Sequence, residues 1–200
     1  MDLLVATTNT HKLTEIRRLL AGLPIHIDTL SAYPAIAEPE EVGATFAQNA
    51  RLKATYYSQQ AGRRSISEDS GLEIDALGGE PGVHSARFNG ESYAEKFATI
   101  YERLLARGTS GSTARFVCAL AVADGPRITF EARGVVEGQI ASEPTGETGF
   151  GYDPIFFYPP YERTLAQVSA EEKAAVSHRG QAFRALRTHL EAVLRDCDED

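Results

Sequence analysis

The 200-residue sequence predicts an α/β fold in which helices pack on a mixed β-sheet. Three observations support this prediction. The chain opens with a strand–helix–strand pattern, two long β-rich runs follow one another later, and three capping boxes mark helix starts. Helix–strand units favour parallel pairing, whereas consecutive β-rich runs favour a hairpin, so the sheet is expected to be mixed.

The strand–helix–strand opening lies within the first 30 residues. Residues 3–7 form a short apolar run typical of a buried strand, and residues 25–30 alternate as a second strand does. Between them, residues 10–22 follow a helical period. Its apolar side is formed by Leu13, Ile16, Leu19, Leu20 and Leu23.

A loop rich in Pro and Glu, residues 31–43, leads to a second helix. Thr45 and Gln48 have the spacing of a capping box, which predicts a helix from Thr45 to about Gln60, ended by Gly62. Residues 65–68 indicate a strand, and Asp69-Ser70-Gly71 is predicted to form a turn after it.

The second half of the chain continues with helix, hairpin and helix. The capping box at Ser92 predicts a helix to about Leu105. Residues 113–123 and 127–140 are β-rich, and the Asp-Gly pair between them is a strong hairpin signal. A Gly-rich loop, a short strand over 155–157 and a helical C-terminal segment that begins with a capping box at Ser169 follow. We expect one domain over residues 1–196 and an acidic tail over 197–200.

The formal net charge of −8 makes non-specific nucleic-acid binding a poor expectation, because such binding neutralises phosphates with Lys and Arg. Any phosphate chemistry therefore needs a local cationic site or a divalent metal. There is no signal-peptide pattern, no Cys/His zinc spacing and no apolar stretch near the ~18 residues that cross a bilayer. A cytoplasmic protein without membrane contact is expected.

The first candidate site segment lies between the first strand and the first helix. A helix N-terminus binds anions through its free N–H groups, and this one adds polar side chains and a cation. The candidates are Thr7, Thr8, Asn9, Thr10, His11 and Lys12. Taken alone, Thr8 or Asn9 is better explained as a helix cap. Lys12 opposes the helix dipole and favours a bound anion.

Carboxylates form the second candidate group. Glu38, Glu40 and Glu41 precede the second helix, where acidic residues also stabilise the helix by themselves. Glu68 and Asp69 end a predicted strand, where α/β sheets place ligands. Such a pair suits Mg²⁺, which takes a few carboxylates and completes its shell with water and phosphate oxygens. The alternative is an ordinary Asp-Ser-Gly turn.

Further candidates come from the last third of the chain and from the second helix. In the Gly-rich loop 148–154, Phe150 is suited to stack on a base, although the loop by itself favours aromatics that fold into the core. The polar residues Lys173, His178 and Arg179 offer hydrogen-bond donors, or mark the start of the last helix. Lys53 is a further candidate cation or a surface lysine. Gly-x-Ser-x-Gly and Walker A motifs are absent from the sequence. The anion-binding loop, the carboxylates, the Phe150 loop and the donor cluster together indicate a metal-assisted nucleotide hydrolase.

Six segments in this order resemble the inosine triphosphate pyrophosphatase family, also called dITP/XTP or non-standard purine NTP pyrophosphatases. They are Ala6–Leu13, Glu40–Ala50, Glu68–Leu72, Gly78–Arg87, Gly149–Phe156 and Glu172–Gly180. The resemblance covers nearly the whole chain. It implies an α/β fold with an elongated mixed sheet and two lobes around an active-site cleft. It also implies a homodimer and a Mg²⁺ requirement.

The activity implied by the resemblance is hydrolysis of ITP, dITP and XTP to monophosphate and pyrophosphate, which removes them from the nucleotide pool. Glu40 and Asp69 would bind metal, with Glu41 as the alternative glutamate, and Asp69 would also accept a proton. The implied substrate contacts are those of Thr7–Lys12, Lys53, Ser70, Phe150, Gly151, Tyr152, Asp153, Lys173, His178 and Arg179.

The chain departs from the family pattern at Thr8, Thr10 and His11, where relatives often carry glycine or small residues. Side chains at these positions bear on the phosphate contacts. Two other functions compete with the pyrophosphatase. One is a Maf-type pyrophosphatase of other modified nucleotides, and the other is a nucleotide-binding regulator without catalysis.

Overall fold

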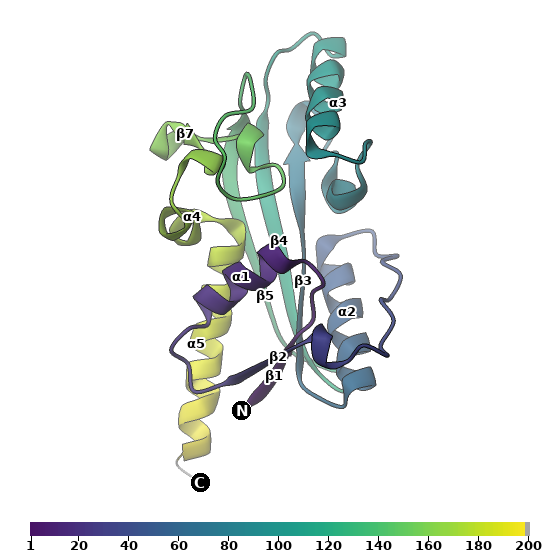
Figure 1. Ribbon diagram of the computed structural model, residues 1–200, viewed down its shortest axis with the longest axis vertical. Helices are drawn as coiled ribbons and strands as arrows, with labels where there is room; N and C mark the ends of the chain where they lie inside the picture. The colour runs from purple at the N-terminus through teal and green to yellow at the C-terminus, as the bar shows by residue number, and fades with distance from the viewer. Residues whose placement is uncertain (199–200) are drawn as a thin grey trace. The chain divides into compact units, whose positions relative to one another are not determined.

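The computed structural model describes residues 1–198, with side chains up to residue 196, and contains a seven-stranded sheet with flanking helices (Figure 1). The strands are β1 (Asp2–Val5), β2 (His26–Thr29), β3 (Ser65–Ile74), β4 (Thr113–Asp124), β5 (Arg127–Ile140), β6 (Phe156–Tyr158) and β7 (Arg163–Thr164). The α-helices are α1 (Thr10–Leu19), α2 (Phe46–Ala61), α3 (Tyr93–Ala106), α4 (Ala170–Val176) and α5 (His178–Asp198). Within the predicted acidic tail, residues 199 and 200 and all the side chains lie outside this description.

The sheet is mixed, as the sequence predicts. Its strand order is β2-β1-β3-β4-β5-β6-β7. Strand β1 pairs in parallel with both β2 and β3, whereas β6 pairs antiparallel with β5 and β7. Strands β4 and β5 are neighbours joined only by Gly125 and Pro126, and Gly125 adopts the positive φ of +56° that the Asp-Gly signal predicts.

The chain divides into two compact units, each made of several segments. Unit 1 comprises Met1–Asp69, Cys118–Gly134 and Arg179–Asp200, and unit 2 comprises Ser70–Val117 and Val135–His178. The division falls inside strands β3, β4 and β5 and directly after the first residue of α5. Residues that are adjacent in sequence at these points therefore belong to different units.

The core of unit 1 follows from the alternation of side chains along its strands. Leu3 and Val5 of β1 and Ile66 of β3 pack with helices α1 and α5, whereas Leu4 and Ala6 pack with Tyr57 of α2. Helices α1 and α5 thus cover one face of these strands and α2 covers the other (Figure 1). The apolar residues Phe183, Leu186 and Leu190 of α5 are all buried in this core.

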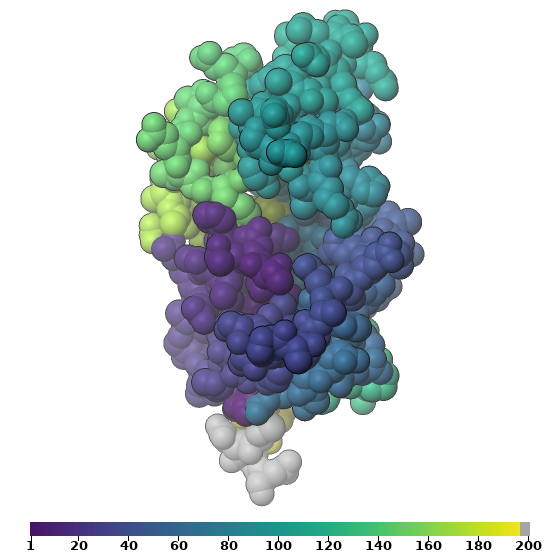
Figure 2. Space-filling view, turned by 45° about the vertical axis from the view of Figure 1, so that its right-hand side comes forward, coloured from purple at the N-terminus to yellow at the C-terminus, as the bar shows by residue number. Residues whose placement is uncertain are grey.

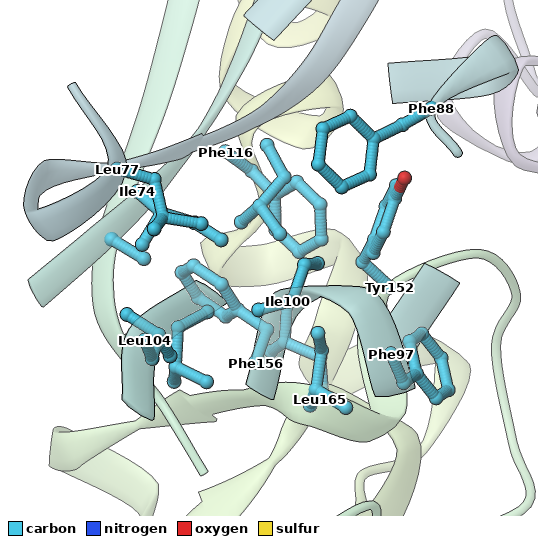
Figure 3. Packing of buried hydrophobic residues seen from close by; sticks show 14 of the residues in the cluster. Ile74, Leu77, Phe88, Phe97, Ile100, Leu104, Phe116, Tyr152, Phe156 and Leu165 are labelled. Atoms are coloured by element: carbon cyan, nitrogen blue, oxygen red, sulfur yellow. The ribbon is translucent and has the colours of Figure 1, made fainter. Parts of the chain in front are cut away.

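The core of unit 2 is rich in aromatic residues. Ile100 and Leu104 of α3 pack against Phe116 and Phe156, whose ring centroids lie 4.5 Å apart (Figure 3). The Tyr152 ring belongs to the same cluster, and its hydroxyl donates to the Ser85 carbonyl oxygen at 2.8 Å. This core holds the Gly-rich loop that precedes β6 against the body of unit 2.

Strand β3 corrects one prediction. The expected turn at Asp69-Ser70-Gly71 is wrong, because the strand continues through these residues to Ile74. Gly71 has no positive φ and serves close packing instead. A Cβ placed on it would lie 2.3 Å from Ser85 Oγ and 2.6 Å from the Gly82 carbonyl oxygen. Asp69 therefore lies in the middle of a strand.

The predicted helix starts are confirmed. Thr45, Ser92 and Ser169 each accept a hydrogen bond from the third helical residue, and the last two form complete capping boxes. Gln48 instead accepts from the Ala44 N–H. Helix α2 ends at Gly62, whose φ of +61° closes the helix. Among the described residues, no helix combines the length and the apolar character that crossing a bilayer requires.

Candidate active site

The loop between β1 and α1 presents its polar side chains to solvent. Thr8, Thr10 and His11 are exposed, and Thr7 is half-buried. Thr7 Oγ1 accepts from the Asn9 N–H at 3.2 Å, and Asn9 Oδ1 caps α1 by accepting from the Lys12 N–H at 3.1 Å. Asn9 thus has the capping role that was one of the two sequence interpretations, and the loop can still present N–H groups at the start of a helix.

Lys12 reaches from the first turn of α1 to a buried carboxylate. Its Nζ lies 2.8 Å from Glu68 Oε1, and the Glu68 side chain is only 1% exposed. The same oxygen accepts from Arg179 Nη2 at 3.2 Å. Arg179 also donates to Glu15 Oε2 at 2.7 Å. These four residues form one ion-pair network in unit 1, on the face of β3 that α1 and α5 cover.

Asp69 is the next residue of β3, and its side chain belongs to a second cluster. Its Oδ2 accepts from Asn49 Nδ2 at 3.0 Å, and its Oδ1 lies 3.5 Å from Lys53 Nζ. Lys53 also forms a short hydrogen bond to Glu41 Oε1. Asn49 and Lys53 are four residues apart on α2, so they present the same helix face to Asp69. An ammonium group therefore lies between two carboxylates.

The pKa shifts of the two neighbouring carboxylates have opposite signs. Burial raises the pKa of Asp69, and Lys53, the Asn49 hydrogen bond and Lys12 offset this only in part. Burial acts the same way on Glu68, but the charges of Arg179, Lys12 and Lys53 outweigh it and hold the pKa of Glu68 well below its usual range. Glu68 is thus a committed anion, whereas Asp69 is the better proton acceptor of the two.

The pKa of Lys53 is raised. Burial by itself lowers it, but the charges of Asp69, Glu41 and Glu68 outweigh the burial. Lys53 is therefore a buried cation rather than the surface lysine of the alternative interpretation. A cation of this kind is suited to a phosphate group as well as to its carboxylate partners.

The three glutamates before α2 differ in their surroundings. Residues 31–43, which carry them, run over the surface of unit 1 (Figure 2). Glu38 and Glu40 are exposed, whereas Glu41 is half-buried and contacts Lys53. The structure thus brings Glu41, the alternative glutamate, next to the Asp69 cluster. The choice between Glu40 and Glu41 as metal ligand stays a prediction.

A separate cluster forms in unit 2 around the loop that carries Phe150. Lys173 Nζ lies 2.6 Å from Asp153 Oδ2, with both side chains buried, and 4.6 Å from the centroid of the Phe150 ring. The same carboxylate oxygen accepts from the Phe150 N–H at 2.8 Å. A Cβ on Gly149 would lie 2.2 Å from that oxygen, so glycine is required there. The structure thus brings Phe150, Asp153 and Lys173 together, and their role at a base stays a prediction.

Other members of the predicted base-binding group are placed differently. Tyr152 is buried in the core of unit 2, and Gly151 provides a positive φ of +69° beside it. The His178 ring stacks on Phe116 with centroids 4.9 Å apart. Ser70 is half-buried and is the first residue of unit 2. Arg179 belongs to unit 1, where its guanidinium binds Glu15 and Glu68.

Sequence reasoning missed Asn49, and it missed the pairing of Glu68 with Lys12 and Arg179. Asn49 is 1% exposed, and a polar residue four positions before Lys53 on a helix was the available signal for it. The partners of Glu68 gave no such signal, because Arg179 is 111 residues away in sequence. Only the folded chain brings these residues together.

The oxygen donors around Asp69 have the chemistry of a hard-cation site. Nowhere in the described part of the chain do three or more His, Cys, Asp or Glu side chains form a group that could hold a metal ion alone. Asp69 and Glu41, both in contact with Lys53, offer two carboxylates. Two carboxylates fit Mg²⁺, which typically leaves its other positions to waters and substrate phosphates.

Comparison with known families identifies the group to which these motifs belong. A model of the Ham1 family matches residues 3–189. The chain belongs to the Ham1 family. Its solved members include a HAM1 protein from Coxiella burnetii, with 38% identity over 96% of this chain and 99% of that one and a TM-score of 0.89. The Staphylococcus aureus Ham1 protein has 34% identity over the same shares of the two chains and a TM-score of 0.85.

Related sequences carry a more specific name. A dITP/XTP pyrophosphatase of Exiguobacterium sp. strain AT1b is 44% identical over 95% of this chain and 97% of its own length. A dITP/XTP pyrophosphatase of Geobacillus kaustophilus is 41% identical over 96% of both chains. The similarity therefore runs over nearly the full length of the chain, as the six sequence segments predict.

Proposed function

We propose that this Ham1-family protein hydrolyses the non-standard purine nucleotides dITP, ITP and XTP to the monophosphate and pyrophosphate, and so removes them from the nucleotide pool. The observation that supports this chemistry is the cluster of Asp69, Lys53 and Glu41, together with Lys12 in the first turn of α1. The near full-length relatives named dITP/XTP pyrophosphatase support the substrate class.

Mg²⁺ is the proposed cofactor, bound by Asp69 together with Glu40 or Glu41. When bound, it would neutralise charge on the phosphate oxygens. Lys53 contacts both Glu41 and Asp69, so it holds these two carboxylates together and compensates their mutual repulsion. The two carboxylates do not repel a polyanion outright, because Lys53 and Lys12 supply positive charge beside them.

The proposed reaction is attack of water on the α-phosphorus. A bond forms between the water oxygen and the α-phosphorus, the bond from the α-phosphorus to its bridging oxygen breaks, and pyrophosphate leaves. Asp69 orients the water and accepts its proton, which is consistent with the burial that raises its pKa. Lys12 and Lys53 hold the leaving pyrophosphate, whose developing charge they stabilise.

Base recognition is assigned to residues of unit 2. Phe150 offers a ring for stacking on the purine, Lys173 and Asp153 offer polar groups near it, and His178 belongs to the same unit. Donors aimed at a 6-oxo group pair with hypoxanthine and xanthine, whereas the adenine amino group would face them donor to donor. Buried polar groups left unpaired in this way impose a large penalty on the wrong base.

A substrate panel tests the proposal. Pyrophosphate release is measured with Mg²⁺ on dITP, XTP, GTP, ATP and modified pyrimidine triphosphates, with kcat/KM as the readout. We expect dITP and XTP to exceed ATP by at least about 100-fold, the discrimination that unpaired polar groups provide. We also expect them to exceed GTP, which shares the 6-oxo group but carries a 2-amino group. Equal turnover of GTP or ATP would contradict the specificity. A preference for modified pyrimidines would favour the Maf-type alternative, and binding without turnover would favour a regulator.

We also propose a cytoplasmic homodimer, on the strength of the family resemblance. Sedimentation equilibrium of the purified protein measures the assembly directly. The expected particle mass is twice the chain mass of 21.7 kDa. A particle of single-chain mass at micromolar concentration would contradict the dimer while leaving the proposed activity intact.

A further inference from the structure

We propose that Asn49 is a positioning residue that ties the loop carrying Glu40 and Glu41 to Asp69, so that the carboxylates for a divalent cation are held together before the cation binds. The inference deepens the proposed function and rests on it for the presence of a cation site. It gives Asn49 a role toward the cation without making it a ligand. The residues involved all belong to unit 1.

The two ends of the Asn49 amide contact two different segments of unit 1. Its Oδ1 accepts from the Gly43 N–H at 2.7 Å, and its Nδ2 donates to Asp69 Oδ2 at 3.0 Å. A backbone N–H donates and a carboxylate oxygen accepts, so only one orientation of the amide satisfies both partners. The side chain is therefore a bridge between the loop and strand β3.

Asn49 occupies a position where asparagine is otherwise unfavourable. It lies inside α2, and it is only 1% exposed. Asparagine forms helices less well than alanine, and burial of an amide costs free energy unless hydrogen bonds replace those to water. The two hydrogen bonds of the side chain offset these costs. The bridge, rather than helix stability, accounts for an asparagine at this position.

The loop approaches α2 closely at Gly43. A Cβ on Gly43 would lie 2.4 Å from Asn49 Oδ1 and 2.9 Å from the Asn49 backbone nitrogen, so glycine permits the contact. Gly43 follows Glu41 by two residues and Glu40 by three. A tie at Gly43 thus restricts both candidate glutamates, whichever of them binds the cation.

Asn49 and Lys53 hold Asp69 from the same face of α2. Lys53 Nζ lies 3.5 Å from Asp69 Oδ1 and also contacts Glu41, whereas Asn49 contacts Oδ2. A carboxylate oxygen has more than one lone pair, so the bond to Asn49 leaves Oδ2 able to bind a cation. Hydrogen-bond partners of this kind orient metal-binding groups and strengthen metal binding.

Metal binding in the absence of substrate tests the inference. Mn²⁺, which favours the same oxygen ligands as Mg²⁺, is titrated into EDTA-treated and dialysed protein, and the free ion is followed by electron paramagnetic resonance. We expect Asn49→Ala to weaken Mn²⁺ binding by about 10- to 100-fold, the usual effect of removing a partner of a metal-binding group. Gln59→Ala removes an exposed amide from the same helix and is the matched control, with wild-type affinity expected.

Asn49→Asp separates the two ends of the bridge. It keeps the shape of the side chain and the acceptor for the Gly43 N–H, but it replaces the donor to Asp69 with a carboxylate oxygen. We expect kcat for dITP at saturating Mg²⁺ to fall by at least about 10-fold, because Asp69 loses its orienting partner. KM should change by less than about 2-fold, because the substrate contacts remain. A residue that only capped the loop would tolerate this change.

Hydrogen exchange of the Gly43 amide measures the loop side of the bridge without metal or substrate. In protein with isotope-labelled glycine, exchange should be slow in the wild type and in Asn49→Asp, and fast in Asn49→Ala. Thermal unfolding verifies that each variant is folded. If Asn49→Ala is not folded, kcat of Asn49→Asp decides the question.

Two results would overturn the inference. One is a folded Asn49→Ala variant with wild-type affinity for Mn²⁺, and the other is wild-type kcat in Asn49→Asp. Turnover of dITP by a wild-type protein that binds no Mn²⁺ would also overturn it, while leaving the substrate class intact. Conversely, a wild-type protein that binds Mn²⁺ through Asn49 but does not turn over dITP would refute the proposed substrate and support the bridge.

Discussion

Two neighbouring acidic residues of one strand have opposite electrostatic character. Glu68 is surrounded by Arg179, Lys12 and a thiol donor, and the charges of Arg179 and Lys12 keep it ionised despite its burial. Asp69 has fewer compensating partners, and its pKa is raised. Residue type does not distinguish the two, because both are carboxylic acids. Their surroundings make one an anchor and the other a candidate base.

Asp69→Asn tests the proposed role of the Asp69 carboxylate most directly. It keeps the size of the side chain and removes both the proton acceptor and a metal-binding oxygen. We expect kcat for dITP to fall by about 10²- to 10⁴-fold, the usual contribution of a general base. The melting temperature should not fall, because burial disfavours the Asp69 charge in the fold. Steady-state pyrophosphate release and thermal unfolding measure the two effects.

Asp124→Asn is the control for that variant. Asp124 is exposed at the end of β4 and pairs with Arg64, so its change should leave the activity intact. Wild-type kcat in Asp69→Asn would remove Asp69 from the catalytic proposal.

At the level of secondary-structure elements, capping residues and glycines determine where helices start and end and where segments pack closely. Capping boxes start α3 and α4, and a left-handed glycine ends α2. Gly71 is different, because it lies inside β3 with ordinary backbone angles. Glycine is needed at position 71 because the 3₁₀ turn over Gly82–Arg87 packs directly on the strand. In this contact Ser85 Oγ accepts from the Leu72 N–H at 2.9 Å.

Gly71→Ala should therefore destabilise the protein. The added methyl group would lie 2.6 Å from a backbone oxygen, which cannot rotate away as a side chain can. We expect the free energy of unfolding to fall by about 1–3 kcal/mol, the cost of overpacking. Urea denaturation measures the change.

Gly111→Ala is the matched control for Gly71→Ala, because a methyl group added at Gly111 would have its nearest neighbour, the Ile140 carbonyl oxygen, 3.9 Å away. It should be close to neutral in the same denaturation experiment. A Gly71→Ala variant as stable as Gly111→Ala would contradict the packing argument for β3.

At the scale of the whole molecule, the net charge of −8 opposes the approach of a polyanionic nucleotide. Local cations reduce this repulsion, but the proposed phosphate contacts Lys12 and Lys53 are themselves paired with Glu68, Glu41 and Asp69. Further positive charge must therefore accompany the substrate. A divalent cation that binds carboxylates and phosphates together supplies it.

Removal of divalent metal should consequently abolish turnover. We expect EDTA to reduce pyrophosphate release from dITP by at least about 100-fold, and Mg²⁺ to restore it, because the metal neutralises several phosphate charges at once. A monovalent salt at equal ionic strength, which only screens charge, should not restore it. Full activity in EDTA would contradict the metal requirement while leaving the substrate class open.

The sequence alone determined the features that depend on local order. Helix starts at Ser92 and Ser169 follow from hydrogen bonds over three residues, and the hairpin follows from Asp124-Gly125. The motif segments indicated the family, because their order along the chain is itself sequence information. The same motif segments identified Asp69 as a site residue.

The tertiary structure decided what depends on contacts between distant residues. The turn expected at Asp69 became a strand, because packing against Ser85 and Gly82 accounts for Gly71 without a turn. The partners of Glu68 come from α1, β4 and α5, over separations of 50 to 111 residues. No local pattern encodes such pairings. Charge compensation inside a fold depends on which side chains meet, and only the packed chain determines that.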